Sequence, residues 1–231
     1  HREVARQQRS RNHVVVAAIV GYTNAGKSTL LNHLTAAGIL AEDKLFATLD
    51  PTTRNLKLPS GQEILLTDTV GFIRKLPHHL IEAFKSTLEE AKYADIILHV
   101  VDCSNPQMDM QMYVVYDTLR QLEVKDKEIV TVFNKIDSVE EGTILKDLTS
   151  DYQVKLSAKT GENVEELTDI LEKILRSRKV YLEQLYPTAR REKFRLIRKY
   201  GELLEEEYRE DGIYVKAYVA AESYGNVLPE K

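Results

Sequence analysis

The sequence predicts an α/β fold: a mostly parallel β-sheet with helices on both faces, followed by a small C-terminal α+β appendage. Up to about residue 176, short runs rich in valine, isoleucine and leucine alternate with stretches of helical periodicity. Runs that are apolar throughout are typical of strands buried on both faces, as in a parallel sheet between helices. After residue 176 this alternation ends, and the pattern changes to one long amphipathic stretch.

The central strands are predicted from apolar runs at residues 14–20, 63–67, 96–101, 129–133 and 154–156. Helical periodicity lies between them at residues 28–36, 80–93, 108–122 and 164–174. A strand near residues 56–58 is expected to be the antiparallel edge, because the turn formers Pro59 and Gly61 connect it directly to the next run. The amphipathic stretch after residue 176 is predicted to be helical, interrupted near Pro187 and ended by Gly212, before a strand at residues 213–219.

A glycine-rich segment follows the first predicted strand and precedes the first predicted helix. It reads Gly21-Tyr22-Thr23-Asn24-Ala25-Gly26-Lys27-Ser28-Thr29. It fits the pattern G-x-x-x-x-G-K-[ST], in which backbone N–H groups and the helix N-terminus surround phosphate groups. Lys27 is expected to contact the β- and γ-phosphates, and the Ser28 hydroxyl is expected to ligate Mg²⁺. The alternative is a chance glycine-rich turn, but both flanks have the required pattern, so we expect a nucleoside triphosphate to bind here.

Two further motifs follow predicted strands and indicate contacts with the phosphates and with the base. The first is Asp68-Thr69-Val70-Gly71, in which Asp68 can hold Mg²⁺ through a water and the Gly71 N–H can donate to the γ-phosphate. The second is Asn134-Lys135-Ile136-Asp137. The Asp137 carboxylate can accept both N–H groups of the guanine edge, a donor pair that adenine does not offer. Asn134 can reach the base or brace the loop, and the stem of Lys135 can lie across the ring.

The last motif, Ser157-Ala158-Lys159, follows the strand predicted at residues 154–156 and offers a backbone N–H to the guanine O6. All four motifs are therefore expected at the carboxyl ends of strands, where ligands of doubly wound sheets bind. Together and in this order, they predict that the ligand is GTP or GDP, bound with Mg²⁺.

Residues 14–176 resemble the P-loop GTPases of the translation-factor class, and three segments resemble the HflX family of ribosome-associated GTPases. These segments are the glycine-rich loop, the residues from Asp68 to Ile73, and Phe46-Ala47-Thr48-Leu49-Asp50-Pro51-Thr52-Thr53-Arg54. The resemblance implies an enzyme that hydrolyses GTP, binds the large ribosomal subunit and its RNA, and splits or rescues ribosomes. It also implies an N-terminal domain outside this chain. We therefore expect residues 1–12 to end a linker helix, residues 13–177 to form the G domain, and residues 178–231 to form a C-terminal helix and α+β appendage.

Two other functions stay open at this point. A GTPase of the same class that acts in ribosomal subunit assembly would carry the same motifs, and only the HflX-like segment around Thr48 argues against it. A P-loop kinase or motor that uses ATP is disfavoured by the guanine-binding pattern at residues 134–137.

The switch residue is expected to be a threonine that contacts Mg²⁺ only when the γ-phosphate is present. Thr48, Thr52 and Thr53 compete for this role. The pattern Phe-x-Thr-Leu-x-Pro from Phe46 to Pro51 resembles that of Obg-type GTPases and assigns the role to Thr48. The pattern Pro-Thr-Thr-Arg at residues 51–54 instead resembles tRNA-modifying GTPases and would assign the role to Thr53. We choose Thr48 because its spacing from the glycine-rich loop agrees with the first pattern.

Hydrolysis is expected to be slow without a partner. Phe72 follows Gly71 where signalling GTPases have a water-orienting glutamine, and a phenyl ring cannot hydrogen-bond to water. The missing group would come from the ribosome or from K⁺, because potassium-activated relatives ligate K⁺ through an asparagine at the position of Asn24. The match is partial, since those relatives often have proline where this chain has Thr23.

The composition is that of a compact protein in a reducing compartment. The 231 residues carry a formal net charge of −4, and the single cysteine, Cys103, excludes a disulfide within the chain. No apolar stretch is long enough to span a membrane, so we expect a cytoplasmic monomer with at most weak association with a membrane surface. Nine basic residues against two acidic ones at residues 176–199 could touch RNA or form a solvated face. His99, inside an apolar run, is expected to be a hydrogen-bonded core histidine.

Overall fold

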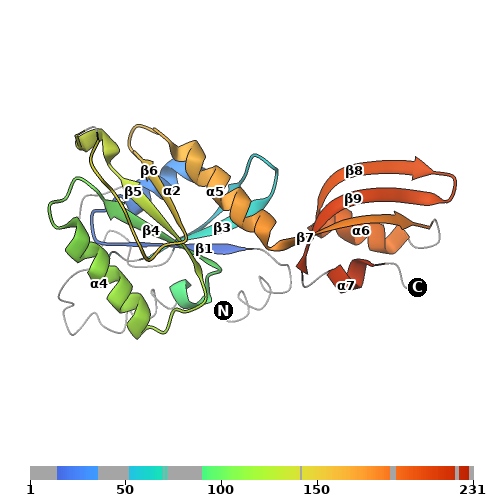
Figure 1. The fold of residues 1–231 in the computed structure, drawn as a ribbon, viewed down its shortest axis with the longest axis horizontal. Helices are drawn as coiled ribbons and strands as arrows, with labels where there is room; N and C mark the ends of the chain where they lie inside the picture. The colour runs from blue at the N-terminus through green and yellow to red at the C-terminus, as the bar shows by residue number, and fades with distance from the viewer. Residues whose placement is uncertain are drawn as a thin grey trace. The chain divides into compact units, whose positions relative to one another are not determined.

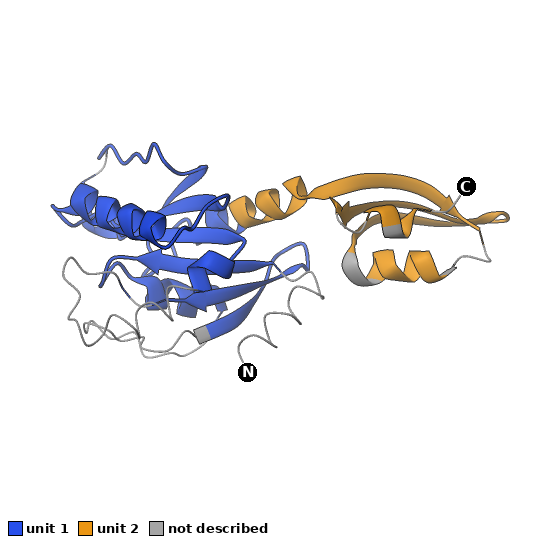
Figure 2. Ribbon diagram, turned by 90° about the horizontal axis from the view of Figure 1, so that it is seen from below, with its two compact units in different colours: residues 1–168 blue, residues 169–231 orange. Residues whose placement is uncertain are grey.

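The structure is a computed structural model that describes residues 15–35, 52–69, 71, 90–140, 142–187, 191–221 and 224–228. The chain divides into two compact units, residues 1–168 and residues 169–231 (Figures 1 and 2). Helix α5 (Val164–Ser177) crosses the division between them. The domain boundary expected after residue 177 stays a prediction.

Among the described residues, the first unit forms a six-stranded sheet with the strand order β2-β3-β1-β4-β5-β6. Its strands are β1 (Val16–Gly21), β2 (Thr52–Lys57), β3 (Glu63–Asp68), β4 (Ile96–Asp102), β5 (Glu128–Asn134) and β6 (Tyr152–Leu156). Strand β2 runs antiparallel to β3 at one edge, and the other neighbouring strands are parallel. The predicted α/β fold with its antiparallel edge strand is therefore confirmed.

Helices pack on both faces of this sheet, as predicted. The first unit contains α2 (Lys27–Thr35), α4 (Met108–Gln121), the short 3-10 helix η2 (Ile136–Ser138) and the beginning of α5. On one face, Ala18 and Val20 of β1 pack in one cluster with Val115 and Leu119 of α4. Figure 1 shows α2 on the other face, and His33 of α2 lines a common depression with residues at the beginning of α5. Of the helix expected at residues 80–93, only residues 90–93 are described, and these are helical.

The strand register gathers the predicted motifs at one edge of the sheet. Ile19 lies beside Asp68 in the β1–β3 pair, and Asn134 lies beside Asp102 in the β4–β5 pair. Asn134 also lies beside Leu156 of β6. Because the carboxyl ends of parallel strands meet at one edge, the segments that follow β1, β3, β5 and β6 lie close together.

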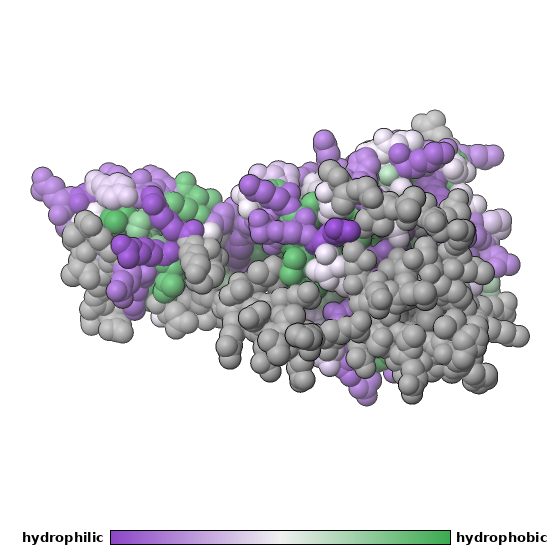
Figure 3. All heavy atoms as spheres, turned by 180° about the vertical axis from the view of Figure 1, so that it is seen from behind, coloured by the Kyte–Doolittle hydropathy of each residue, from purple (hydrophilic) through white to green (hydrophobic). Residues whose placement is uncertain are grey.

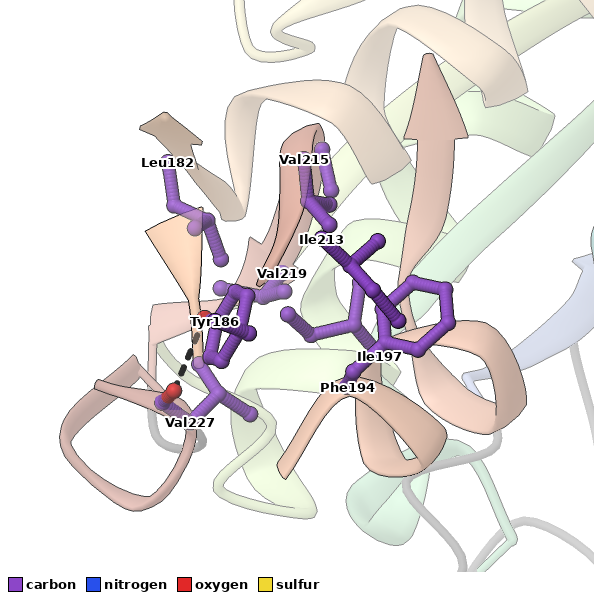
Figure 4. Close-up of a cluster of buried hydrophobic side chains, with 9 residues drawn as sticks. Leu182, Tyr186, Phe194, Ile197, Ile213, Val215, Val219 and Val227 are labelled. Atoms are coloured by element: carbon purple, nitrogen blue, oxygen red, sulfur yellow. Dashed lines mark hydrogen bonds between the residues drawn. The ribbon is translucent and has the colours of Figure 1, made fainter. Parts of the chain in front are cut away.

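The second unit contains a three-stranded antiparallel sheet with the order β7-β9-β8. Its elements are β7 (Lys179–Tyr186), α6 (Arg191–Tyr200), β8 (Glu202–Arg209), β9 (Gly212–Ala220) and α7 (Tyr224–Val227). Side chains from both helices and from β7 and β9 form its core, in which the Tyr186 hydroxyl donates to the Val227 carbonyl at 2.8 Å (Figure 4). The unit is thus an α+β arrangement, as predicted.

The predicted long helix after residue 176 is wrong, because the segment forms a strand, a helix and a second strand. In β7, Leu182 is buried between exposed Tyr181 and Glu183, which is the two-residue period of a strand. The α6 helix ends where the Gly201 N–H donates to the Ile197 carbonyl at 2.8 Å. Strand β8 is rich in leucine and glutamate, which favour helices, but its pairing with β9 overrides that preference.

The described side chains visible in Figure 3 are mostly hydrophilic, with smaller hydrophobic areas between them. Several large apolar side chains are exposed, including Ile144 and Leu148 of the segment before β6. Within the described parts of the chain, no helix has both the length and the apolar character that crossing a bilayer requires.

Candidate nucleotide-binding site

The glycine-rich loop leaves β1 at Gly21 and enters α2 at Lys27. Asn24 and Gly26 both have positive φ angles, 62° and 94°, which turns successive backbone N–H groups toward one side. A Cβ atom at Gly26 would lie only 2.2 Å from Nδ2 of Asn134. Glycine is therefore required at this position for its backbone conformation and for the approach of a neighbouring loop.

Lys27 is 7% exposed, and its Nζ donates to the carbonyl oxygens of Gly21 and Tyr22, both at 3.2 Å. Burial lowers the pKa of this lysine to about 8, and the carboxylate of Asp68 opposes that shift. A buried ammonium group bonded to loop carbonyls can exchange these acceptors for phosphate oxygens. This arrangement agrees with the role predicted for Lys27.

Ser28 and Asp68 lie together, as a magnesium site requires. The Ser28 hydroxyl donates to Oδ2 of Asp68 at 2.9 Å, and Asp68 is 2% exposed. Hydroxyl and carboxylate oxygens are hard ligands that suit Mg²⁺, which keeps several waters and takes its other ligands from the substrate phosphates. Among the described residues, no group of three or more His, Cys, Asp and Glu side chains could hold a metal by itself. The pair therefore fits Mg²⁺ bound together with a nucleotide.

The segment after β3 is held against the glycine-rich loop. Thr69 is fully buried, and its N–H and hydroxyl both donate to the Ile19 carbonyl of β1, at 3.2 and 2.7 Å. A Cβ atom at Gly71 would lie 2.9 Å from Cα of Thr23 and 3.0 Å from Nζ of Lys27. The Gly71 backbone is thus next to the group expected to contact the γ-phosphate, where its predicted role requires it to be.

Asn134 braces two loops. Its Nδ2 donates to the Ala25 carbonyl at 2.8 Å, and its Oδ1 accepts the Ala158 N–H at 2.9 Å. The side chain is 3% exposed, so both bonds lie in a protected environment. Of the two roles left open for Asn134, the structure contains the brace.

Lys135 and Asp137 occupy the remaining positions of the same motif. Lys135 has a left-handed φ of 69°, and its Nζ contacts Oδ2 of Asp102 at 2.7 Å. Asp137 is exposed, and a hydrogen bond from the buried Ser157 hydroxyl holds its pKa below the ordinary range. The carboxylate is therefore charged and faces solvent at the place where a guanine edge would bind.

The loop after β6 has already used most of its backbone N–H groups. The Ser157 N–H donates to the Glu162 carbonyl, and the Ala158 N–H donates to Asn134. Of residues 157–159, Lys159 is the one whose N–H has no hydrogen-bond partner within the described chain. The prediction that this motif offers an N–H to the guanine O6 is thereby narrowed to Lys159 in this conformation.

Other predicted site residues lie outside the described residues: Phe46, Ala47, Thr48, Leu49, Asp50, Val70 and Phe72. Tyr22, Thr23, Thr29 and Ile136 are described, and all are partly exposed beside the residues discussed above. The choice of Thr48 as the switch residue therefore stays a prediction.

His99 of β4 is a core residue, as predicted, but it is not fully hydrogen-bonded. It is 1% exposed and meets the Tyr116 ring edge-on at 4.9 Å. Its Nδ1 has no hydrogen-bond partner within the described chain, and burial lowers its pKa to about 4. The histidine is therefore neutral at ordinary pH.

Asp102 was not singled out from the sequence, and Ser157 was named only as part of a motif that offers a backbone N–H, so the role of its side chain was missed. Asp102 contacts Lys135, and Ser157 orients Asp137 through its hydroxyl. Asp102 could have been found, because it is an acid at the end of an apolar run, where site residues of a parallel sheet gather. The role of Ser157 could not, because a serine in a turn has many local partners.

Comparison with known proteins agrees with this geometry. The sequence model of the family described as 50S ribosome-binding GTPase matches residues 16–135. The chain is 73% identical over 227 residues to GTPase HflX of Lacrimispora saccharolytica, covering 98% of this chain and 54% of the relative. It is 48% identical over 222 residues to GTPase HflX of Caldanaerobacter subterraneus subsp. tengcongensis, covering 96% of this chain and 51% of the relative. The chain thus spans about half the length of these curated relatives.

A solved structure resembles the fold as well. It is a GTP-binding protein from the archaeon Sulfolobus solfataricus in complex with GDP, with a TM-score of 0.58 and 27% identity. The alignment covers 75% of this chain and 56% of that one. The P-loop fold, the motifs at its carboxyl edge and the identity to curated relatives agree, and the chain belongs to the HflX family of GTPases.

Proposed function

We propose that this chain binds GTP and GDP with Mg²⁺ at the carboxyl edge of the six-stranded sheet and hydrolyses GTP. The observation that carries the proposal is the double hydrogen bond of Asn134, which joins the phosphate loop at Ala25 to the base loop at Ala158. Two loops that are tied in this way form one site for a ligand with phosphates at one end and a base at the other.

The roles of individual residues follow from their places in this site. Lys27 contacts the β- and γ-phosphates, and Gly71 donates its N–H to the γ-phosphate. Ser28, Thr48 and, through a water, Asp68 hold Mg²⁺, which when bound neutralises charge on the phosphates. Asp137 accepts the two N–H groups of the guanine edge.

Base selection can be tested by titrating the protein with fluorescent GDP and fluorescent ADP. GDP is expected to bind far more tightly, because adenine lacks the donor pair that Asp137 accepts. An Asp137→Asn variant should lose GDP and gain xanthosine diphosphate, because an amide can donate to the xanthine carbonyl. Equal binding of GDP and ADP by the unmodified protein would refute the guanine assignment.

Hydrolysis is proposed to be slow in the isolated protein, because Phe72 follows Gly71 where a water-orienting glutamine would otherwise stand. K⁺ is one source of the missing positive charge, with Asn24 as its ligand. The exposed position of Asn24 and its φ of 62° leave the side chain accessible beside the phosphate loop. GTP turnover should then be faster in KCl than in NaCl for the unmodified protein but not for Asn24→Ala. Equal rates of the unmodified protein in both salts would refute activation by K⁺.

The partner is proposed to be the large ribosomal subunit in the cytoplasm, with splitting or rescue of ribosomes as the outcome. Support comes from the description of the matching family as 50S ribosome-binding and from the HflX relatives. The test is GTP turnover with and without purified large subunits, with small subunits as the control. We expect large subunits alone to stimulate turnover, and a Ser28→Ala variant to show no stimulation. No stimulation of the unmodified protein would overturn the assignment, whereas preference for immature subunits would indicate a role in assembly.

A further inference from the structure

Asp102 is the last residue of β4 and lies in register with Asn134, the residue directly before Lys135. Its Oδ2 contacts the Lys135 ammonium at 2.7 Å. The Lys135 side chain is therefore held in place, as that of Asn134 is. The Asp102 side chain is 12% exposed, whereas that of Lys135 is 35% exposed. The pair is therefore formed by a mostly buried carboxylate and a half-buried cation at the edge of the candidate site.

The carboxylate is itself fixed. Its other oxygen, Oδ1, accepts the Ser104 N–H at 3.0 Å and the Ser104 hydroxyl at 2.6 Å. The backbone directly after Asp102 is also held, because the Cys103 N–H donates to the Asn134 carbonyl at 3.0 Å. A lysine that contacts such a carboxylate is restricted at both ends of its side chain, by its own backbone and by Asp102.

The backbone of Lys135 adds a second argument. Its φ of 69° lies in the left-handed region, which costs a residue with a Cβ about 1 kcal/mol or more. Glycine or asparagine would adopt this conformation more easily. The cost of this backbone conformation is best explained if the Lys135 side chain has a function at the site.

We propose that Asp102 is a positioning residue for base recognition: it holds the Lys135 ammonium so that the aliphatic stem forms a preformed surface for the guanine ring. This inference rests on the proposed function, since it assumes that guanine binds at Asp137. A free lysine side chain samples many rotamers, and ordering it on binding reduces affinity. Asp102 removes that loss before the nucleotide arrives.

The test is the isosteric variant Asp102→Asn. Ordering one long side chain costs on the order of 1 kcal/mol, so the Kd of fluorescent GDP should rise about fivefold to tenfold. The KM for GTP should rise by the same factor while kcat is unchanged, because the base is remote from the γ-phosphate. Ser104→Ala, which removes one of the bonds that fix the carboxylate, should have a smaller effect in the same direction.

A double-mutant cycle separates positioning from simple stabilisation. Lys135→Met keeps an apolar stem but has no ammonium group, so adding Asp102→Asn to it should cause no further loss of GDP affinity. Asp117→Asn is the matched control, because it removes a carboxylate that contacts Arg120 at 3.1 Å on α4. The control variant should bind GDP as the unmodified protein does.

The outcomes distinguish the two proposals. If the unmodified protein does not prefer GDP to ADP, the proposed function fails and this inference fails with it. If it prefers GDP but Asp102→Asn and Ser104→Ala bind GDP normally, only the positioning role of Asp102 is refuted. A fall in kcat with unchanged KM, or additive losses in the double variant, would also refute it.

Discussion

The Asn134 brace can be removed with one substitution, Asn134→Ala. The change deletes an amide that is 3% exposed, and it leaves the Ala25 carbonyl and the Ala158 N–H without their partners at 2.8 and 2.9 Å. Each buried polar group left unpaired costs about 1–3 kcal/mol. Water entering the space compensates in part, so we expect the free energy of unfolding to fall by about 3 kcal/mol.

The assay combines urea unfolding with GDP binding. A loss of this size lowers the melting temperature of a unit of this length by about 6–12 °C. The matched control is Asn55→Ala, which removes an exposed asparagine bonded to Glu63 at 2.9 Å and should change stability by less than about 0.5 kcal/mol. Asn134→Asp is the informative second variant, because it can still accept the Ala158 N–H but places a carboxylate against the Ala25 carbonyl.

We expect Asn134→Asp to weaken GDP binding, because its carboxylate repels the Ala25 carbonyl and so disturbs the phosphate loop. The reasoning is refuted if Asn134→Ala is no less stable than Asn55→Ala. It is also refuted if Asn134→Ala is destabilised but binds GDP with unchanged affinity, because the brace would then have no part in the site.

Three further predictions concern other parts of the molecule. Burial holds the pKa of Lys27 at about 8, and bound phosphates should raise this pKa because they favour the ammonium form. The GDP affinity measured by titration should therefore be constant below pH 8 and fall as the pH rises above 8. The affinity of Lys27→Met should not fall in this way. Gly71→Ala places a Cβ 2.9 Å from the backbone of Thr23, so GTP turnover measured by phosphate release should fall at least tenfold, and normal turnover would contradict the role of Gly71. Tyr186→Phe leaves the Val227 carbonyl without its donor at 2.8 Å and should lower the stability of the second unit by about 1–2 kcal/mol in thermal unfolding, whereas exposed Tyr181→Phe should not.

The central strands of the sheet in the first unit, β1, β4 and β5, could be predicted from the sequence because they are mainly apolar and buried. Strands β4 and β5 contain runs such as Ile96–Val101 that fit few other structures, and the glycine-rich loop has a pattern whose flanks can be checked. The second unit could not be predicted in the same way. Strand β8 alternates only partly and consists mainly of glutamate and leucine, so its strand conformation depends on pairing with β9, which lies later in the chain.

The candidate site shows a similar limit. The residues proposed to contact phosphate and base could be named from motifs, because each motif has a known chemistry. The choice between two roles for Asn134 could not be made, since an amide side chain can serve either, and only the positions of Ala25 and Ala158 decide it. The same holds for the proposed donor to the guanine O6, because Lys159 becomes the candidate only once the Ala158 N–H is found to be bonded to Asn134.

Position 134 requires a side chain that donates to one loop and accepts from another. A charged aspartate offers acceptors only, and the serine and threonine side chains are too short to reach both partners. Glutamine is one methylene longer, and there is little room for it, because the Asn134 amide already lies close to Gly26: a Cβ atom there would be 2.2 Å from Nδ2. Of these residues, only asparagine meets these conditions, and it meets them at the carboxyl end of β5, where the parallel register brings both loops within reach. Since one amide bonds to both loops, a nucleotide that moved the proposed phosphate loop would also act on the loop proposed to contact its base. In the proposed function, phosphate binding and base recognition are therefore coupled through one side chain.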